Sequence, residues 1–587
     1  MGGALRPLSP IVPRRSPLVA AGPLALVPLA IQAGLVGSVG LGLLSLLLPA
    51  FGYLPALGET RFDLAPLRAA LAYPGLGKAV GVTFASGLLA TAAALAMALA
   101  LVTLLDPLGE GAGPAGRLLQ RAVLGVIATP HIAIAIGLAF LLSPSGWILR
   151  VAAAIVGIER PPDFLLLNDP LGLALTLALV IKETPFVIAV VLGALHRIDA
   201  AAQLRVGQSL GYTPGMACIK IVLPQVYRLI RLPILAVLAY GLSVADLSIV
   251  LGPDLPPTLP VLILRLLADP DLGNRLTAAG AGLIQIALVA AGFLLWRFGE
   301  AVGQRLWHRA VASGRRTFGH TLKVVGRPVL LGVGSLLLVL GLLAIAAILL
   351  WSVADVWRFP AIFPSRFSLD AWNRALGTIG LPLGTSLALA GVSTAIALAG
   401  SIACLELEDR IGHAAGRRGQ WVLFLPLFAP EMGFLFGLQV AASAAGLGGT
   451  MTATLWFHLL FVFPYVFLTL SEPWRALDDR LVRTARCLGA GRWRVLLKIK
   501  APILRAPLVL TAAVGFSVSL SLYLPTVLAG AGRITTLATE TVTLYGGGDR
   551  RVLAVYSLLQ AGLSVAAFAA AAFAARPRRF AGHRGRS

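Results

Sequence analysis

Long apolar runs separated by short polar segments restrict the fold of this chain more than any other sequence feature. Of its 587 residues, 58% are hydrophobic and 12% are charged, whereas soluble domains carry about 25% charged residues. A helix needs about 20 apolar residues to cross a bilayer, so the sequence predicts an all-α integral membrane protein. We count twelve predicted spans, at about residues 24–50, 77–104, 122–143, 171–195, 230–252, 275–296, 329–352, 381–404, 420–443, 451–472, 507–530 and 551–575.

The chain is strongly basic, with a net charge of +23. Such a charge can indicate nucleic-acid binding, but the basic residues fall mostly in short loops between apolar runs, as the positive-inside rule describes. We therefore expect contact with membrane lipid and none with nucleic acid. Arginines precede the first span and follow the last, so both termini are predicted to be cytoplasmic. The segment 144–170 is predicted to be external, with a short interfacial helix near 147–158.

A polar, basic stretch of twenty residues occurs twice between apolar runs. The first copy, Arg205–Pro224, reads RVGQSLGYTPGMACIKIVLP, and the second, Arg483–Pro502, reads RTARCLGAGRWRVLLKIKAP. Each copy has a glycine, an isoleucine ten residues later and a proline three further on: Gly211, Ile221, Pro224, Gly489, Ile499 and Pro502. We predict two cytoplasmic loops, at about residues 196–229 and 473–506.

Other pairs of residues repeat in the same order along the chain. Pro130 and Gly137 are seven residues apart, as are Pro430 and Gly437. Pro185 precedes Asp199 by fourteen residues, as Pro464 precedes Asp478, and GLSVADLSIVLG from Gly241 matches GFSVSLSLYLPT from Gly515. These matches predict two six-span halves, 1–296 and 328–587, joined by a basic cytoplasmic linker, 297–327. Because six is even, the halves form a parallel repeat with a path between them.

The loop residues suit a helix that leaves the membrane, turns and returns. Gly211 and Gly489 can adopt positive φ and end the first helix. Pro224 and Pro502 suit the first turn of the next helix, where a missing N–H matters little. The nine residues between Gly and Ile are long enough for a short helix lying in the cytoplasm.

This spacing resembles the EAA loop of ABC importer permeases, in which Gly, nine residues, Ile, one residue and Leu-Pro follow in order. Gly211, Ile221, Leu223 and Pro224 match in full, and the second loop has Ala501 in place of Leu. The chain is similar to the fused ferric-iron and thiamine permeases, and more similar still to a less characterised fused branch. The resemblance implies the type I importer fold, a bacterial inner-membrane location, two ATPase subunits bound at the loops and a periplasmic solute-binding protein.

The sequence departs from the family pattern at the Glu-Ala-Ala triplet. Arg205 and Arg483 stand where the family has the glutamate that contacts the ATPase. Two arginines suggest an acidic residue on the partner. Alternatively, the nearby Asp199 and Asp478 take over this contact.

Ionisable residues within predicted spans require a functional hypothesis, because a charge near the bilayer centre costs about 2.5–3.5 kcal/mol on insertion scales. Lys182 and Glu183 are adjacent, so they diverge by about 100° on a helix and cannot face one another. One of them could face a cavity and the other a neighbouring helix. The candidates for a polar translocation path are Glu183, Ser243, Asp246, Glu431, Ser517 and Ser519. The alternative is that they form hydrogen bonds between helices, and we favour this alternative for the serines.

The sequence contains no phosphate-binding Gly-x4-Gly-Lys-Ser/Thr loop. We therefore expect a transport subunit rather than an enzyme, with ATP hydrolysed by a partner. Its three cysteines and seven histidines show no metal-type spacing, and no cofactor, metal or catalytic residue is predicted. An ion-coupled twelve-span secondary transporter is the main alternative, with Asp246 or Glu183 as proton carrier, and a membrane enzyme is a weaker one. The solute could be thiamine-like, ferric iron, a polyamine or an oxyanion, since mixed buried charges do not select its sign.

Overall fold

The computed structural model describes residues 24, 26–104, 126, 128–164, 166–317, 325–411 and 417–575. In this part of the chain ten helices are long and apolar enough to cross a membrane, or twelve if two bent pairs each count as one span. A two-stranded antiparallel sheet, β1 (Ala354–Val356) with β2 (Arg366–Phe367), is the small exception to an all-helical architecture. The predicted all-α membrane fold is confirmed.

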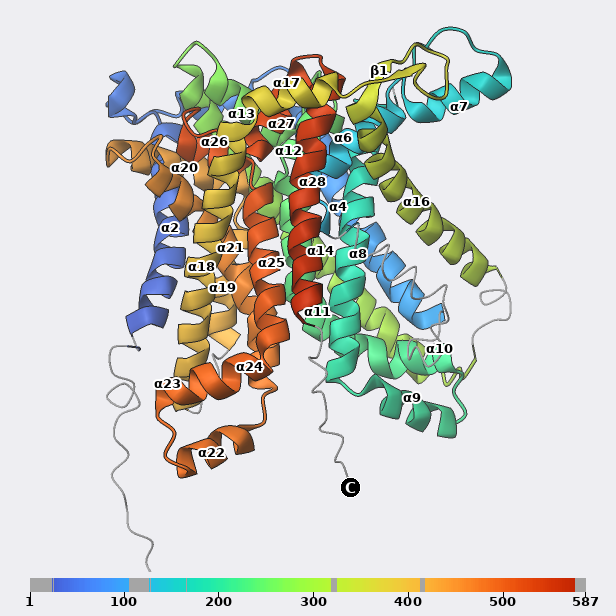
Figure 1. Ribbon diagram of the computed structural model, residues 1–587, viewed down its shortest axis with the longest axis vertical. Coiled ribbons are helices and arrows are strands. Elements are labelled where there is room, and N and C mark those ends of the chain that lie inside the picture. The colour runs from blue at the N-terminus through green and yellow to red at the C-terminus, as the bar shows by residue number, and fades with distance from the viewer. Residues whose placement is uncertain are drawn as a thin grey trace, which may run out of the picture.

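Short helices and loops lie at both ends of the helix bundle (Figure 1). We call the end with α9 (Ala200–Ser209) and α22 (Asp479–Cys487) the loop end, and the end with α7 (Trp147–Val156) and α17 (Asp370–Thr378) the opposite end. The remaining elements up to the linker are η2 (Pro55–Leu57), α2 (Leu26–Ala50), α3 (Ala65–Leu71), α4 (Leu76–Leu104), α6 (His131–Leu142), α8 (Leu173–Arg197), α10 (Pro214–Ala217), η3 (Cys218–Val222), α11 (Leu223–Ser243), α12 (Asp246–Leu251), α13 (Leu259–Ala268) and α14 (Asn274–Ala312).

After the linker the chain contains β1, β2, α17 and α22, whose bounds are given above. The remaining elements there are α16 (Gly326–Val353), α18 (Gly380–Ile411), α19 (Arg417–Phe428), α20 (Glu431–Ala444), α21 (Met451–Arg475), α23 (Arg492–Val495), η4 (Leu496–Lys500), α24 (Ala501–Ile503), α25 (Arg505–Ser521), α26 (Leu524–Gly530), α27 (Leu537–Gly546) and α28 (Arg550–Ala574).

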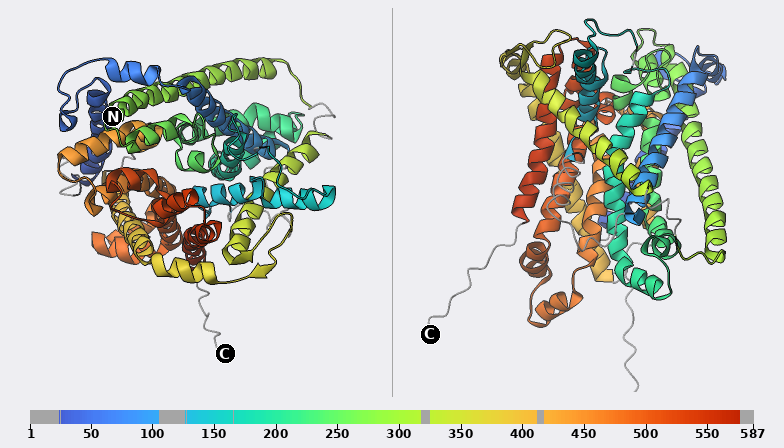
Figure 2. Two further views of the ribbon diagram at one scale, coloured as in Figure 1. Left: turned by 90° about the horizontal axis from the view of Figure 1, so that it is seen from above. Right: turned by 90° about the vertical axis from the view of Figure 1, so that its right-hand side faces the viewer.

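The first helix of each half packs against the other half. Helix α2 lies along α18, α19 and α20, and α16 lies along α4, α6 and α8 (Figures 1 and 2). Two glycines make these crossings close: a Cβ on Gly437 would overlap the backbone of Gly42, and one on Gly137 would overlap the backbone of Ala344. Small residues permit such close helix packing in membranes. The glycine of each repeated Pro-to-Gly pair therefore lies at a close contact between the halves.

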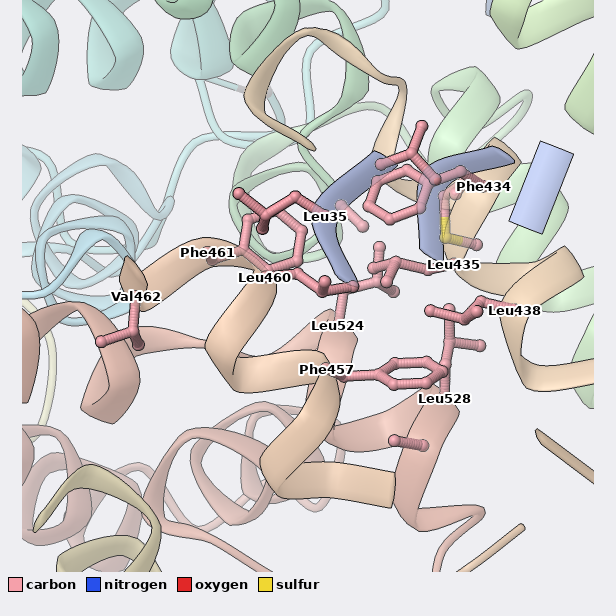
Figure 3. Close-up of a cluster of buried hydrophobic side chains, with 14 of the residues drawn as sticks. Leu35, Phe434, Leu435, Leu438, Phe457, Leu460, Phe461, Val462, Leu524 and Leu528 are labelled. Carbon is pink, nitrogen blue, oxygen red and sulfur yellow. The ribbon is translucent and has the colours of Figure 1, made fainter. Parts of the chain in front are cut away.

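Aromatic and branched side chains fill the core where α2 meets the second half. Leu35 of α2 lies beside Phe434 and Leu435 of α20, with Phe461 of α21 and Leu524 of α26 nearby (Figure 3). These side chains are almost fully buried. Contacts of this kind fix α2 in the second half, because packing and close approach drive helix association in lipid.

The predicted span 420–443 is not a straight helix. It consists of α19 and α20, which meet at an angle of 92° at Pro430. Proline lacks the N–H that would continue the hydrogen-bond ladder, so the helix breaks there. Residues 122–125 and 127 of the corresponding span 122–143 lie outside the described residues, and its remainder, α6, also begins directly after a proline, Pro130.

The predicted spans 230–252 and 507–530 are also interrupted, at 244–245 and 522–523. Gln285 donates to the carbonyl oxygen of Leu242, at 2.5 Å, and Gln560 donates to that of Leu520, at 3.0 Å. Because both helix breaks and both glutamine bonds are equivalent, Leu242 in the first half corresponds to Leu520 in the second. The expected match of Gly241 with Gly515 is therefore wrong by four residues, because the repeated Gly-x-Ser-Val letters recur one helical turn earlier in the second half.

The linker is shorter than the predicted 297–327. Helix α14 continues to Ala312, and α16 begins at Gly326. No proline interrupts residues 274–312, and Arg297, Arg305 and Arg309 of the expected linker lie in the helix. The chain turns after Ser313 at Gly314, whose φ is 64°.

A helix, α7, is present near the expected residues 147–158 and lies at the opposite end. Its Arg150 is buried, with its guanidinium 4.7 Å from the ring centre of Trp357. It donates to the carbonyl oxygens of Trp357, Arg358 and Ala361. This residue ties α7 to the loop between β1 and β2, and so joins the two halves at this end.

Candidate functional site: two membrane loops and a carboxylate cluster

The first loop turns at Gly211 and continues into α11. Helix α9 ends at Ser209, and Gly211 has a φ of 84°, in the left-handed region that glycine tolerates. The next helix begins at Pro214, passes through the π-helical turn η3 and becomes α11, which has Pro224 in its first turn. The expected separate short helix is therefore the beginning of α11, so the loop is rigidly joined to a membrane helix.

The second loop repeats this geometry. Gly489 has a φ of 78°, α23 begins at Arg492, and the π-helical turn η4 contains Ile499 as η3 contains Ile221. Pro502 lies in the first turn of α24. Here the helix then bends by 80° before α25. The predicted glycine and proline conformations are present in both loops.

Arg205 and Arg483 lie on exposed surfaces of α9 and α22. Among the described residues neither arginine forms an ion pair, so both guanidinium groups are available to a partner. The carboxylates of Asp199 and Asp478 instead accept hydrogen bonds from the backbone N–H groups of Ala202 and Arg480 at the starts of these helices. Both aspartates thus serve as N-caps.

A buried ion cluster ties the second loop to the membrane helices. Lys500, which is 1% exposed, donates to Glu406 and Asp409 of α18, each at 2.6 Å. Its Nζ lies 5.0 Å from the ring centre of Trp474, and the indole of Trp474 also donates to Asp409. This cluster was not predicted, although Lys500 precedes Pro502 by two residues and acidic residues follow the predicted span 381–404.

Within the membrane, the adjacent Lys182 and Glu183 point to different partners. Lys182 is buried and donates to the carbonyl oxygens of Val126 and Thr129, at 3.0 and 2.6 Å. Glu183 instead faces His131, with Oε1 and Nε2 3.4 Å apart. The helix separates the two charges as their spacing required.

Glu183 belongs to a carboxylate cluster, which we define as Glu183, Asp246 and Glu431. Asp246 and Glu431 begin α12 and α20, each directly at a helix break. The ring centre of Tyr240 of α11 lies 5.1 Å from that of His131, which faces Glu183. Helix α12 contacts α6 and α8, and α20 contacts α11. The three carboxylates therefore lie on helices that meet near the junction of the two halves.

The candidate serines have other partners. Ser243 donates to the carbonyl oxygen of Ala239 in its own helix. Ser517 donates to Ser564 of α28, and Ser519 bonds to His458 of α21, which also contacts Thr526. His458 was not predicted as a site residue, since a single histidine in an apolar run was its only signal. In the structure Glu183 faces His131, and the serines bond elsewhere.

A cavity of about 260 Å³ lies near the opposite end, between α6 of the first half and α27 and α28 of the second. Phe140, Tyr545 and Arg550 contribute to its wall. None of the residues of the carboxylate cluster lines it. Among the described residues no group of His, Cys, Asp and Glu is placed to hold a metal ion.

One known protein is similar to this chain over most of its length, and others over about a third of it. It is 31% identical over 527 residues to the inner membrane ABC transporter permease protein YnjC of Escherichia coli K12, covering 89% of this chain and 92% of that protein. It is 26% identical over 227 residues to the putative 2-aminoethylphosphonate transport system permease protein PhnV of Salmonella paratyphi A, covering 36% of this chain and 81% of PhnV. The PhnV protein of Salmonella typhi is also 26% identical, over 82% of its length. No family model matches the chain.

The similarity to YnjC extends across both halves of a chain whose helices are long and apolar enough for ten to twelve membrane crossings. The chain therefore belongs to the ABC transporter permeases of the inner membrane.

Proposed function

We propose that this chain forms the complete membrane pathway of an ATP-driven importer, with one half-pathway from residues 1–296 and the other from 328–587. Two ATPase subunits bind the two loops, and a periplasmic binding protein delivers the solute at the opposite end. The main support is the repeated loop geometry: each loop has a glycine at positive φ, a π-helical turn and a proline in the next helical turn. PhnV, which corresponds to 36% of this chain, fits a chain built from two such units.

The loops are suited to transmit force from ATPase to membrane. In the first loop α10, η3 and α11 follow one another without a break, so a displacement of the loop would move α11 as a lever. In the second loop Lys500 links the π-helical turn to α18 through Glu406 and Asp409. In this proposal the loop end and both termini are cytoplasmic, as the distribution of basic residues suggests.

We further propose that the solute is cationic. Lys182 donates to the carbonyl oxygens of Val126 and Thr129, whereas Glu183 faces His131. Carboxylates in a low-dielectric site attract positive charge. This arrangement favours thiamine-like solutes, polyamines and ferric iron over oxyanions.

The experiment is reconstitution of the chain in nanodiscs with the ATPase and binding protein encoded by its host. Solute-stimulated ATP hydrolysis is measured with cationic, zwitterionic and anionic solutes. The proposal predicts stimulation by a cation and competition by other cations. Stimulation by oxyanions alone would contradict the charge assignment, and uptake that needs a proton gradient but no ATP would favour the secondary transporter.

A further inference from the structure

The two loops differ in the surfaces that they present. In the second loop α23 exposes Arg492, Trp493 and Arg494, and the Trp493 side chain is 75% exposed. The equivalent residues of the first loop, in α10, are Pro214, Gly215 and Met216, none of which is charged, and Gly215 is buried. The first loop thus lacks the positive charges that α23 carries.

Residues that follow α14 lie against the first loop, beside Gly211 and Thr213. After α14 the chain turns at Gly314, and both the backbone N–H and the hydroxyl of Thr213 donate to the carbonyl oxygen of Arg316, at 2.9 and 3.3 Å. The Arg316 guanidinium lies beside Gly211, with Nη1 3.2 Å from the position that a Cβ would occupy. Among the described residues, no atom lies within 4 Å of the corresponding position at Gly489.

We propose that residues 314–317 are part of the first ATPase-binding site, and that Arg316 supplies there the positive charge that Arg492 and Arg494 supply in the second loop. This inference rests on the proposed function. The partner surface is acidic and belongs to the ATPase subunit, so two copies of one subunit can bind both loops. Arg316 is exposed, and its position over the loop glycine is held by backbone hydrogen bonds rather than by its own side chain.

The geometry explains why the helix α14 is so long. A helix of 39 residues rises about 58 Å at 1.5 Å per residue, well beyond the roughly 30 Å hydrocarbon core. The helix ends at Ala312, four residues before Arg316, which contacts Thr213. The connection between the halves therefore completes the first loop as well as joining the second half.

The test measures how many ATPase subunits bind each nanodisc-embedded chain, and how tightly, without nucleotide and at several salt concentrations. The variants are Arg316→Glu, Arg494→Glu and their combination. Arg305→Glu is the matched control, because it makes the same charge change at an exposed position on α14, outside residues 314–317. Arg316→Lys keeps the positive charge, so it distinguishes an effect of the charge from an effect of changing the side chain.

We expect Arg316→Glu to weaken one of two binding sites by about tenfold or more, as reversal of an interfacial charge does, and Arg494→Glu to weaken the other. The combined variant loses both sites, whereas Arg305→Glu and Arg316→Lys bind two subunits with affinities within about twofold of wild type. Two undisturbed sites in Arg316→Glu would overturn the inference and leave the proposed function intact. A wild-type chain that binds no ATPase would overturn both.

Discussion

Arg197 of α8 and Glu472 of α21 form a bidentate ion pair that joins the two halves at the loop end. The Arg197 Nε donates to one carboxylate oxygen of Glu472 at 3.0 Å, and Nη2 contacts the other oxygen. Helices α8 and α21 are equivalent in the repeat, with Pro185 and Pro464 inside them. The pair therefore closes the junction of the two halves at the end where the proposed importer must open to release its solute.

Breaking this pair should favour the state open at the loop end. Both side chains are about half exposed, so the pair contributes about 0.2–1 kcal/mol. We expect Arg197→Ala or Glu472→Ala to change ATP hydrolysis in the absence of solute by no more than about fivefold. The exchange of charges, Arg197→Glu with Glu472→Arg, should restore the wild-type rate. Additive effects of the two single changes would show that the pair does not couple the halves.

Lys500→Met should destabilise the second loop, because it leaves Glu406 and Asp409 without their shared cation. Removing one partner of a buried ion pair costs about 3–5 kcal/mol. The nearby Lys498→Met is the control, since Lys498 is exposed. Thermal unfolding in nanodiscs should show a clear loss for Lys500→Met and little change for Lys498→Met. Equal unfolding temperatures would mean that the buried cluster contributes little.

Gly137→Leu and Gly437→Leu should each separate a first helix from the opposite half, because a side chain would overlap the backbone of α16 or α2. Overpacking of this kind costs about 1–3 kcal/mol or more. Gly391→Leu is the matched control, since a Cβ there meets no atom within 4 Å. Folded yield and unfolding temperature should fall for the first two variants only. A normal yield for Gly437→Leu would contradict the observed crossing of α2 and α20.

Gly489→Ala should weaken ATPase binding through the backbone alone. Its Cβ would meet open space, but a φ of 78° is unfavourable for alanine, by about 1–2 kcal/mol. Gly489→Asn, which tolerates this conformation better, should retain more binding than Gly489→Ala. Titration of each variant with the ATPase ranks their binding affinities. An alanine variant that binds as well as wild type would argue against a required left-handed turn.

Neutralising the carboxylate cluster should reduce cation-stimulated ATP hydrolysis. We expect Asp246→Asn and Glu431→Gln to raise the solute concentration needed for half-maximal stimulation by roughly 5- to 50-fold, the range of a charge interaction of about 1–2.3 kcal/mol. Asp254→Asn makes the same charge change at an exposed position and should have no such effect. If both variants need the same solute concentration as wild type for half-maximal stimulation, the proposal of a cationic solute is wrong.

Local features of the sequence predicted the loops well. Gly211 and Gly489 turn with positive φ, and Pro224 and Pro502 lie in first helical turns, because these conformations follow from the chemistry of glycine and proline. The approximate positions of the apolar helices were predictable for the same reason, since the thickness of a bilayer sets their length.

Long-range relationships were not predictable from one sequence. Helices α2 and α16 each pack against the opposite half through backbone contacts at Gly42 and Ala344. An apolar run in the sequence does not show which helix it will contact. Helical periodicity predicted that Lys182 and Glu183 face different partners. It did not predict which of the two would join the cluster. The four-residue error in matching Gly241 with Gly515 arose because similar letters recur at helical spacing, whereas the bonds of Gln285 and Gln560 fix the true equivalence.

The most direct test of the central claim is co-purification of the tagged chain from its own host, for wild type and for Gly211→Trp with Gly489→Trp. The account predicts that wild type retains an ATP-binding subunit and hydrolyses ATP, and that the double variant is folded but releases the subunit. A wild-type chain that purifies alone and carries out proton-coupled uptake in liposomes would contradict the assignment of the two loops as ATPase-binding sites.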